Sequence, residues 1–317
     1  MDLFITSTTN TSGTVTIPQQ GWSVNFDVIA NQTTTVNVPN NLGESITAQI
    51  IDNKGIYVET QDTVAVFAIN MEQYTADGSK ILPTQSLGTE YRIATYFGIG
   101  TPGSEFMIVA TEDDTEIIII PTVATTNGDA AGVPFTINLD AGESYMVQTS
   151  VSGGDFTGTS IIGTEESGPC RPFAVFSGSY CSNIPSSCGA CDHIYEQNFP
   201  VPTWGSEYFV IPFNTLDSYT YRVVADQDGT DVTIDGALAG TLAAGAFLEF
   251  NNEDEPHCVV GSNPIACVQY LEGIDCAGDG DPAMLVLNAA SQKIDNITFS
   301  TVESDIITTH NITVITA

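Results

Sequence analysis

Short runs of alternating apolar and polar residues follow one another along the chain, and turn-forming residues separate them. In residues 104–121, SEFMIVATEDDTEIIIIP, two apolar runs flank the acidic segment TEDDT. Val, Ile and aromatic residues with a period of two favour β-strands, so this stretch predicts a hairpin of two strands. Residues 133–149, VPFTINLDAGESYMVQT, predict two more strands around the turn DAGE. The pattern indicates an all-β fold with antiparallel strands.

The same order of strands recurs about three times. Residues 3–39, LFITSTTNTSGTVTIP and WSVNFDVIANQTTTVNVP, precede the stretch described above, and YRVVADQDGTDVTIDG with GTLAAGAFLEF follows it. A second signature follows each copy and is centred on Phe67, Phe176 and Tyr270. A repeat of roughly 100 residues with several short strands predicts tandem β-sandwich-like units.

A short phrase is written twice. LGTEY ends at Tyr91 and WGSEY ends at Tyr208, each after a proline-bearing approach, and AMLVLNAASQKIDNITFSTV is a decayed third version. Glu90 and Glu207 in this phrase could form a repeated ligand site. Residues at a strand entry are more often structural, and we favour that interpretation.

These repeats predict the organisation of the chain. We expect a first unit at 1–86, truncated at its N-terminus, a second at 87–203 and a third at 204–300. Residues 301–317 end in HNITVITA, which predicts the first strand of a further unit or a strand that closes on the first. An unpaired edge strand can add to another chain, so self-association through terminal strands is expected.

Charge excludes several classes of partner. Only 6 Lys and Arg stand against 39 Asp and Glu, for a net charge of −33. Such a surface repels nucleic acid and anionic membranes.

The chain has no apolar run long enough to span a bilayer, so membrane insertion is not expected. Met1 is followed by DLFITSTTN, which lacks the features of a signal peptide, so any export signal is absent from this sequence.

Seven cysteines lie between Cys170 and Cys276. This density among strands and turns favours disulfide bonds and an extracellular or cell-surface location. The segment CSNIPSSCGACDH could instead bind zinc through its cysteines and His193, because thiolates and imidazole are preferred zinc ligands. We favour a loop that is closed by disulfide bonds and holds no metal.

Two acidic loops are candidates for calcium. DCAGDGDP offers Asp275, Asp279 and Asp281, and ADQDGTD offers a weaker set. Carboxylates on a glycine-rich loop can supply several oxygen ligands to Ca²⁺. Asp-Gly is also common in tight turns, and neither loop matches an EF-hand. No cofactor other than this calcium is expected.

Catalytic signatures are scarce. The histidines, His193, His257 and His310, lie in no nucleophile-elbow context, and no phosphate-binding glycine loop occurs. With so many acids, a carboxylate pair for glycoside hydrolysis can always be imagined and carries little weight. Trp22 and Trp204 could stack on sugars, but core anchors are the more common role. The sequence therefore predicts a protein that is not an enzyme.

Several linked motifs resemble a known family. They are KGIYVETQDTVAVFAIN, LPTQSLGTEY, AVFSGSYCSNIP, CDHIYEQNFPVPTWGSEYFVIPF and VTIDG. The chain resembles, over nearly its whole length, the IgGFc-binding protein N-terminal domain family, in the form found in bacterial surface proteins beside adhesion modules. The resemblance implies no catalytic residues. It attributes binding of immunoglobulin Fc to an animal member of the family.

The resemblance also implies that Cys181 pairs with Cys191. We expect further pairs between Cys170 and Cys188 and between Cys258 and Cys276. Cys267 is then left over in an apolar strand, where it is expected to be buried and unreactive.

The leading functional hypothesis is a non-enzymatic extracellular module for cell-surface adhesion or for building a fibre. The alternative is a module that binds glycans or mucins, and a secreted hydrolase is a more distant third. The expected partner is therefore a protein or a glycan at the cell surface.

Overall fold

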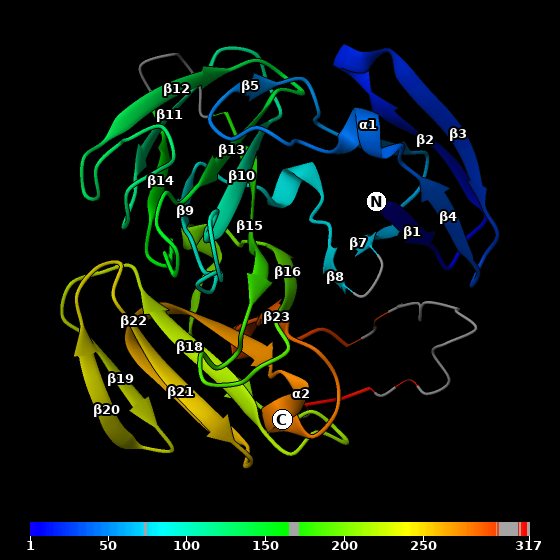
Figure 1. Ribbon diagram of the computed structural model, residues 1–317. Helices are drawn as coiled ribbons and strands as arrows, with labels where there is room; N and C mark the ends of the chain where they lie inside the picture. The colour runs from blue at the N-terminus through cyan, green and yellow to red at the C-terminus, as the bar shows by residue number, and fades with distance from the viewer. Residues whose placement is uncertain (73–74, 165–170, 296, 298–309, 311, 316–317) are drawn as a thin grey trace.

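The computed structural model describes residues 1–317 except 73–74, 165–170, 296, 298–309, 311 and 316–317. The ordered elements are almost all strands, as the sequence predicts (Figure 1). The short helical elements in the described ranges are α1 (Asn40–Gly43), α2 (Ile274–Ala277) and four 3-10 turns, η1 (Pro18–Gln20), η2 (Thr84–Ser86), η3 (Val201–Thr203) and η4 (Ala290–Gln292). None of the helices in this part of the chain has the length and apolar character needed to cross a membrane.

The strands fall into three successive sets. The first set is β1 (Asp2–Thr6), β2 (Thr11–Ile17), β3 (Trp22–Val28), β4 (Thr33–Asn37), β5 (Ile51–Asp52), β6 (Tyr57–Thr60), β7 (Ala65–Glu72) and β8 (Thr75–Lys80). The second is β9 (Glu90–Arg92), β10 (Ser104–Ala110), β11 (Thr115–Ile120), β12 (Phe135–Leu139), β13 (Ser144–Gln148), β14 (Ser160–Gly163), β15 (Phe173–Ser182) and β16 (Asp192–Gln197). The third is β17 (Gly205–Val210), β18 (Tyr219–Ala225), β19 (Thr230–Ile234), β20 (Ala237–Leu242), β21 (Phe247–Glu253), β22 (His257–Leu271) and β23 (Ala283–Val286).

All three sets pair their strands in the same way. In the first, β1 pairs with β4 and β7, and β2 pairs with β3 and β6. In the second, β10 pairs with β13 and β15, and β11 pairs with β12 and β14. In the third, β18 pairs with β21 and β22, and β19 pairs with β20 and β22. In the first and second sets these pairings form two separate sheets, and β5 joins the sheet of the second set by pairing with β13. In the third set the long strand β22 takes part in both groups of pairings, so the strands are connected in one seven-stranded sheet. We call the sets the first, second and third units, and their sequence boundaries stay a prediction.

The hairpin predicted for residues 104–121 is wrong. Its two strands, β10 and β11, lie in different sheets, and the same holds for β12 and β13. The acidic turn therefore carries the chain from one sheet to the facing sheet. This arch lets Phe106 and Ile108 of one strand and Ile117 and Ile119 of the other meet in one core. Alternating apolar residues are equally compatible with a hairpin in one sheet and with an arch between two sheets, because each arrangement gives every strand one buried face.

Each unit has a separate apolar core between its two groups of paired strands. The core of the second unit is built around Phe106, Phe156 and Phe173, and that of the third around Tyr219 and Tyr221. A further cluster includes Tyr96 and Trp204 from the second and third units and fills the space between those units. Burial of this apolar surface is the main driving force that holds the two units together.

The repeated phrase has a structural role. The Tyr91 hydroxyl accepts the Gly88 N–H at 3.0 Å and donates to the Phe173 carbonyl at 2.7 Å. The Tyr208 hydroxyl makes the same two bonds, from the Gly205 N–H at 3.1 Å and to a carbonyl of β22 at 2.7 Å. Each tyrosine thus ties the turn after η2 or η3 to the strand beside it. The repetition reflects this shared strand entry.

Candidate binding groove

One face of the sheet β16-β15-β10-β13-β5 points away from the core of the second unit. In β10, Phe106 and Ile108 are buried in that core, while Met107 lies on the opposite face. The register places Met107 beside Phe176 of β15 on one side and beside Met146 of β13 on the other. These three side chains form an apolar row across three strands.

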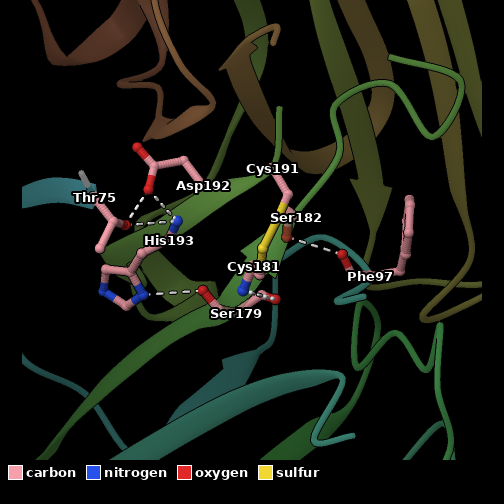
Figure 2. The surroundings of a disulfide bond; sticks show 8 residues. All are labelled: Thr75, Phe97, Ser179, Cys181, Ser182, Cys191, Asp192 and His193. Carbon is pink, nitrogen blue, oxygen red and sulfur yellow. Dashed lines mark hydrogen bonds between the residues drawn. A yellow bond between two sulfur atoms is a disulfide. The ribbon is translucent and has the colours of Figure 1, made fainter. Parts of the chain in front are cut away.

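Aromatic rings extend this row onto β16. Phe176 and Tyr195 are stacked, with centroids 5.6 Å apart, and the His193 ring lies at 6.3 Å from Tyr195. His193 Nδ1 donates to the Ser179 carbonyl at 3.0 Å, as Figure 2 shows, and Nε2 is 3.5 Å from the Asn70 amide of β7. A carbonyl can only accept, so Nδ1 carries the proton and Nε2 accepts from Asn70. His193 therefore connects the second unit to the first.

The first unit supplies the facing wall. Side chains of β6 and β7, with the segments 38–45 and 81–87, stand opposite the apolar row and enclose a groove of about 1090 Å³. Three apolar or aromatic side chains that line it are exposed: Tyr57 by 51%, Met71 by 60% and Tyr180 by 73%. Large exposed apolar side chains gathered in one concavity are typical of a binding surface.

Methionine is concentrated in this groove. The chain has five methionines, and four of them line it: Met1, Met71, Met107 and Met146. Methionine has an unbranched, polarisable side chain that adapts its shape, and it is common on surfaces that receive apolar segments of other proteins. The groove thus has the chemistry of a protein-binding surface.

The charged side chains that line the groove are mostly acidic. Glu44, Glu59 and Glu105 stand against a single Lys or Arg side chain, Lys54, in the described lining. The Lys54 ammonium is occupied, because it donates to the carbonyls of Asn41 at 3.3 Å and Glu44 at 2.5 Å. An apolar floor with acidic side chains favours a partner segment that carries both apolar and basic residues.

The third unit has a face that corresponds to the apolar row of the second unit. In β18, Tyr221 and Val223 enter the core as Phe106 and Ile108 do, so Arg222 corresponds to Met107. Val268 of β22 pairs with Arg222 as Phe176 pairs with Met107. The register therefore makes Val268, and not Tyr270 as the sequence predicted, the counterpart of Phe176.

This face of the third unit is covered by the second unit. The Arg222 guanidinium lies 2.7 Å from the carboxylates of Asp155 and Glu249 and 3.9 Å from the centroid of the Tyr96 ring. It also donates to the Thr95 carbonyl at 2.8 Å. The same face is thus an intramolecular contact between units in the third unit, whereas in the second unit it stays partly open as the groove.

Two disulfide bonds lie at the edge of the groove and between units. Cys181 is joined to Cys191, the pair that the resemblance implies, and links the end of β15 to the start of β16 (Figure 2). Cys188 is joined to Cys276, which ties the loop between these strands to α2 of the third unit. Because Cys181, Cys188 and Cys191 are in disulfides, these three cysteines have no free thiolate to offer in the zinc alternative.

The other expected pairings are wrong. Cys188 pairs with Cys276, so it does not pair with Cys170, which lies outside the described residues, and Cys276 does not pair with Cys258. The reason is strand length. Cys258 stands near the start of β22 and Cys276 beyond its end, and at about 3.3 Å per residue a strand of this length keeps them far apart. Cys258 and Cys267 are the free thiols of the described chain, and Cys267 is fully buried.

The calcium candidates are placed around α2. Asp275 lies in the first turn of α2, the Asp279 carboxylate accepts the Gly280 N–H at 2.9 Å, and Asp281 precedes β23. Partial burial, with the charges of Asp192 and Asp279, raises the pKa of Asp281. The residues that the structure describes contain no group of three or more His, Cys, Asp or Glu side chains that could hold a metal ion, so the three are not brought together as ligands.

The groove was not predicted from the sequence, although the residue pattern of β10 and β15 contains a signal for it. SEFMIVA in β10 and FAVFSGSY in β15 are apolar on both faces, whereas a strand with one solvated face alternates with polar residues. Apolar residues on both faces indicate that the second face is also covered or binds something. Which segment lies opposite that face depends on the packing of the first unit, and no local pattern records it.

Fold and groove together define a class: a disulfide-bonded, all-β protein with an apolar groove between its first and second units. A family model described as "IgGFc binding protein" matches residues 77–317, and the chain belongs to this family. A human protein named "IgGFc-binding protein" [Homo sapiens] is 27% identical over 217 residues, which cover 65% of this chain and 4% of the human protein. No solved structure matches the chain.

The match covers only part of each protein. The chain spans only a small fraction of the human relative. The family region begins at residue 77, so most of the first unit, which forms one wall of the groove, lies outside it. The family model therefore covers less of the chain than the nearly whole-chain resemblance that the sequence indicated.

Proposed function

We propose that this chain is a non-enzymatic extracellular adhesion module that binds an apolar, basic segment of a partner protein in the groove between its first and second units. The observation that carries the proposal is the contrast between equivalent faces. The third unit uses this face to hold another protein unit, and the second unit presents it partly open and lined by methionine.

Charge and family both support a protein as the partner. The net charge of −33 and the acidic side chains in the groove favour a cationic segment. The name of the human relative refers to a protein ligand, the Fc part of IgG. Location at a cell surface or in a fibre is part of the same proposal.

A peptide selection tests this function. A phage-displayed library of random peptides would be selected on the purified, oxidised chain, and purified IgG Fc would serve as a second probe. We expect enrichment of peptides that combine apolar residues with Lys or Arg. Met107→Asp should weaken their binding by about tenfold or more, because it places a charge in the centre of the apolar row.

The matched control is Leu238→Asp, which adds the same charge at a side chain of β20 that is 65% exposed and outside the groove. Thermal unfolding of both variants separates lost binding from lost folding. Equal binding by the two variants would place the site elsewhere. A chain that binds no peptide but saturates with one class of glycan would replace the proposal with the glycan-binding alternative.

A further inference from the structure

The last strands of the three units, β8, β16 and β23, meet near the centre of the molecule (Figure 1). β8 and β16 are edge strands of different sheets, so they share no backbone ladder. Side chains of β8 instead accept hydrogen bonds from alternate amides of β16: Thr75 from the His193 N–H at 3.2 Å, Asp77 from the Tyr195 N–H at 2.9 Å, and Ser79 from the Gln197 N–H at 2.9 Å. β8 thus covers the edge of the groove floor through its side chains.

Two carboxyl groups connect all three strands. The Asp77 carboxyl of β8 accepts the Tyr195 N–H of β16 and also the Met284 N–H of β23 at 3.2 Å. The Glu196 carboxyl of β16 contacts the Ser79 hydroxyl of β8 and the backbone N–H of Val286 in β23. We call the contact of these three strands through Asp77 and Glu196 the clasp.

The titratable side chains beside the clasp are mostly acidic, and Lys80, the last residue of β8, is exposed and forms no ion pair with them within the described residues. On β16, Asp192 accepts the Thr75 hydroxyl, and Asp281 stands just before β23. The His193 ring is directed to Ser179 and Asn70. Within the described residues no Lys, Arg or His forms an ion pair with Asp77 or Glu196.

Partial burial acts on both groups. It raises the pKa of Asp77 to about 7, against the opposing effect of the backbone N–H groups that it accepts. It raises the pKa of Glu196 to about 8. The proximity of Asp77 to Asp192 and of Glu196 to Asp77 acts in the same direction as burial. Each group therefore retains its proton in mildly acidic solution and releases it to water as the pH rises.

We propose that the clasp is a pH-sensitive device that holds the two walls of the groove together while Asp77 and Glu196 are protonated and loosens when they ionise. It rests on the proposed function, because it regulates the same groove. The connection is direct: Thr75 of β8 and Tyr195 and Gln197 of β16 belong both to the clasp strands and to the lining of the groove. Ionisation places two unpaired charges where three strands of a strongly acidic chain meet, which favours their separation.

Methionine methyl groups provide the readout. With ¹³C-methyl labelling, Met284 of β23 reports on the clasp, and Met71, Met107 and Met146 report on the groove. The full chain would be titrated at constant ionic strength. We expect the Met284 and groove signals to shift together, with midpoints between about pH 7 and about pH 8. Methyl signals that stay fixed across this range would overturn the proposal.

Single substitutions show which carboxyl group causes each part of the shift in the methyl signals. Glu196→Gln removes one ionisation and keeps the shape, so it should remove the higher-pH part of the shift, and Asp77→Asn should remove the lower part. The controls, Asp62→Asn and Glu112→Gln, remove equal charges at exposed side chains and should titrate as the parent chain does. If Asp77→Asn fails to fold, Glu196→Gln alone still decides: a titration identical to its control would contradict the clasp.

The same experiment separates the two proposals. Methyl signals that titrate in a chain that binds no peptide at any pH would support the clasp and overturn the groove as a binding site. Peptide binding that is unaffected by pH, with methyl signals that do not shift, would support the groove and overturn the clasp.

Discussion

At the scale of single residues, the tyrosine hydroxyl of the repeated phrase makes two hydrogen bonds in each copy. Tyr91 and Tyr208 each accept from a glycine amide and donate to a carbonyl of a neighbouring strand, and both side chains are buried. Burial raises the pKa of both hydroxyls to about 12, so they stay protonated and able to donate at physiological pH.

We expect Tyr91→Phe and Tyr208→Phe each to lower the free energy of unfolding by about 1–3 kcal/mol, because each leaves a buried amide and carbonyl without a partner. Urea denaturation measures the change. Tyr57→Phe, at a side chain that is 51% exposed, is the control and should change stability little. Similar small effects for all three variants would show that the hydroxyls do not fix the strand entry.

At the scale of elements, the two disulfides should differ in their contribution. The bond between Cys181 and Cys191 closes a loop with a sequence separation of 10, and the bond between Cys188 and Cys276 spans 88 residues and joins two units. On the loop-closure argument, the longer loop stabilises by roughly 4–5 kcal/mol and the shorter by about 3 kcal/mol.

We therefore expect Cys188→Ala to lower the free energy of unfolding more than Cys181→Ala. Reduction of the parent chain should loosen the region from Cys181 to Cys276 more than the first unit, which contains no cysteine. Hydrogen exchange with and without reductant measures the second effect. Uniform loosening along the chain would contradict this role of the disulfides.

At the scale of the whole molecule, Arg222 joins the second and third units. Its side chain is 4% exposed and lies between the carboxylates of Asp155 and Glu249. Arg222→Met introduces the residue found at the equivalent position of the second unit, yet it leaves two carboxylates unpaired. We expect a loss of about 3–5 kcal/mol, measured by denaturant unfolding. Lys293→Met, at an exposed side chain, is the control, and an equal effect of both changes would mean that Arg222 is not needed at this contact.

The clasp predicts the pH dependence of global stability. The pKa of Asp77 rises from 3.8 to about 7 on folding, and that of Glu196 from 4.5 to about 8. Between these values the folded chain binds more protons than the unfolded chain, so stability falls as the pH rises through this window and is level above it. We expect the chain to be about 2 kcal/mol or more less stable at the upper end than at the lower end.

Chemical denaturation at a series of pH values tests this expectation. The paired variant Asp77→Asn with Glu196→Gln should flatten the dependence, and the exposed pair Asp62→Asn with Glu112→Gln should not. Comparison of the pairs separates the clasp from the general repulsion of a chain with a net charge of −33. Stability that instead increases with pH over this window would reject the assigned direction.

The sequence by itself determined which segments are strands and that the protein is all-β, because a strand with one buried face must repeat apolar residues with a period of two. It also marked the repeated strand entry at Tyr91 and Tyr208 and a disulfide-bonded region. These features depend on neighbours along the chain.

Only the tertiary structure decided which strands pair, which cysteine meets Cys276, and where the groove and the clasp lie. β10 and β11 face each other across a core although their sequence is compatible with a hairpin. Asp77 and Glu196 resemble the many solvated acids of this chain until β8, β16 and β23 meet and partly bury them. Contacts between residues distant in sequence depend on how whole units pack, and a local pattern of residues does not record that packing.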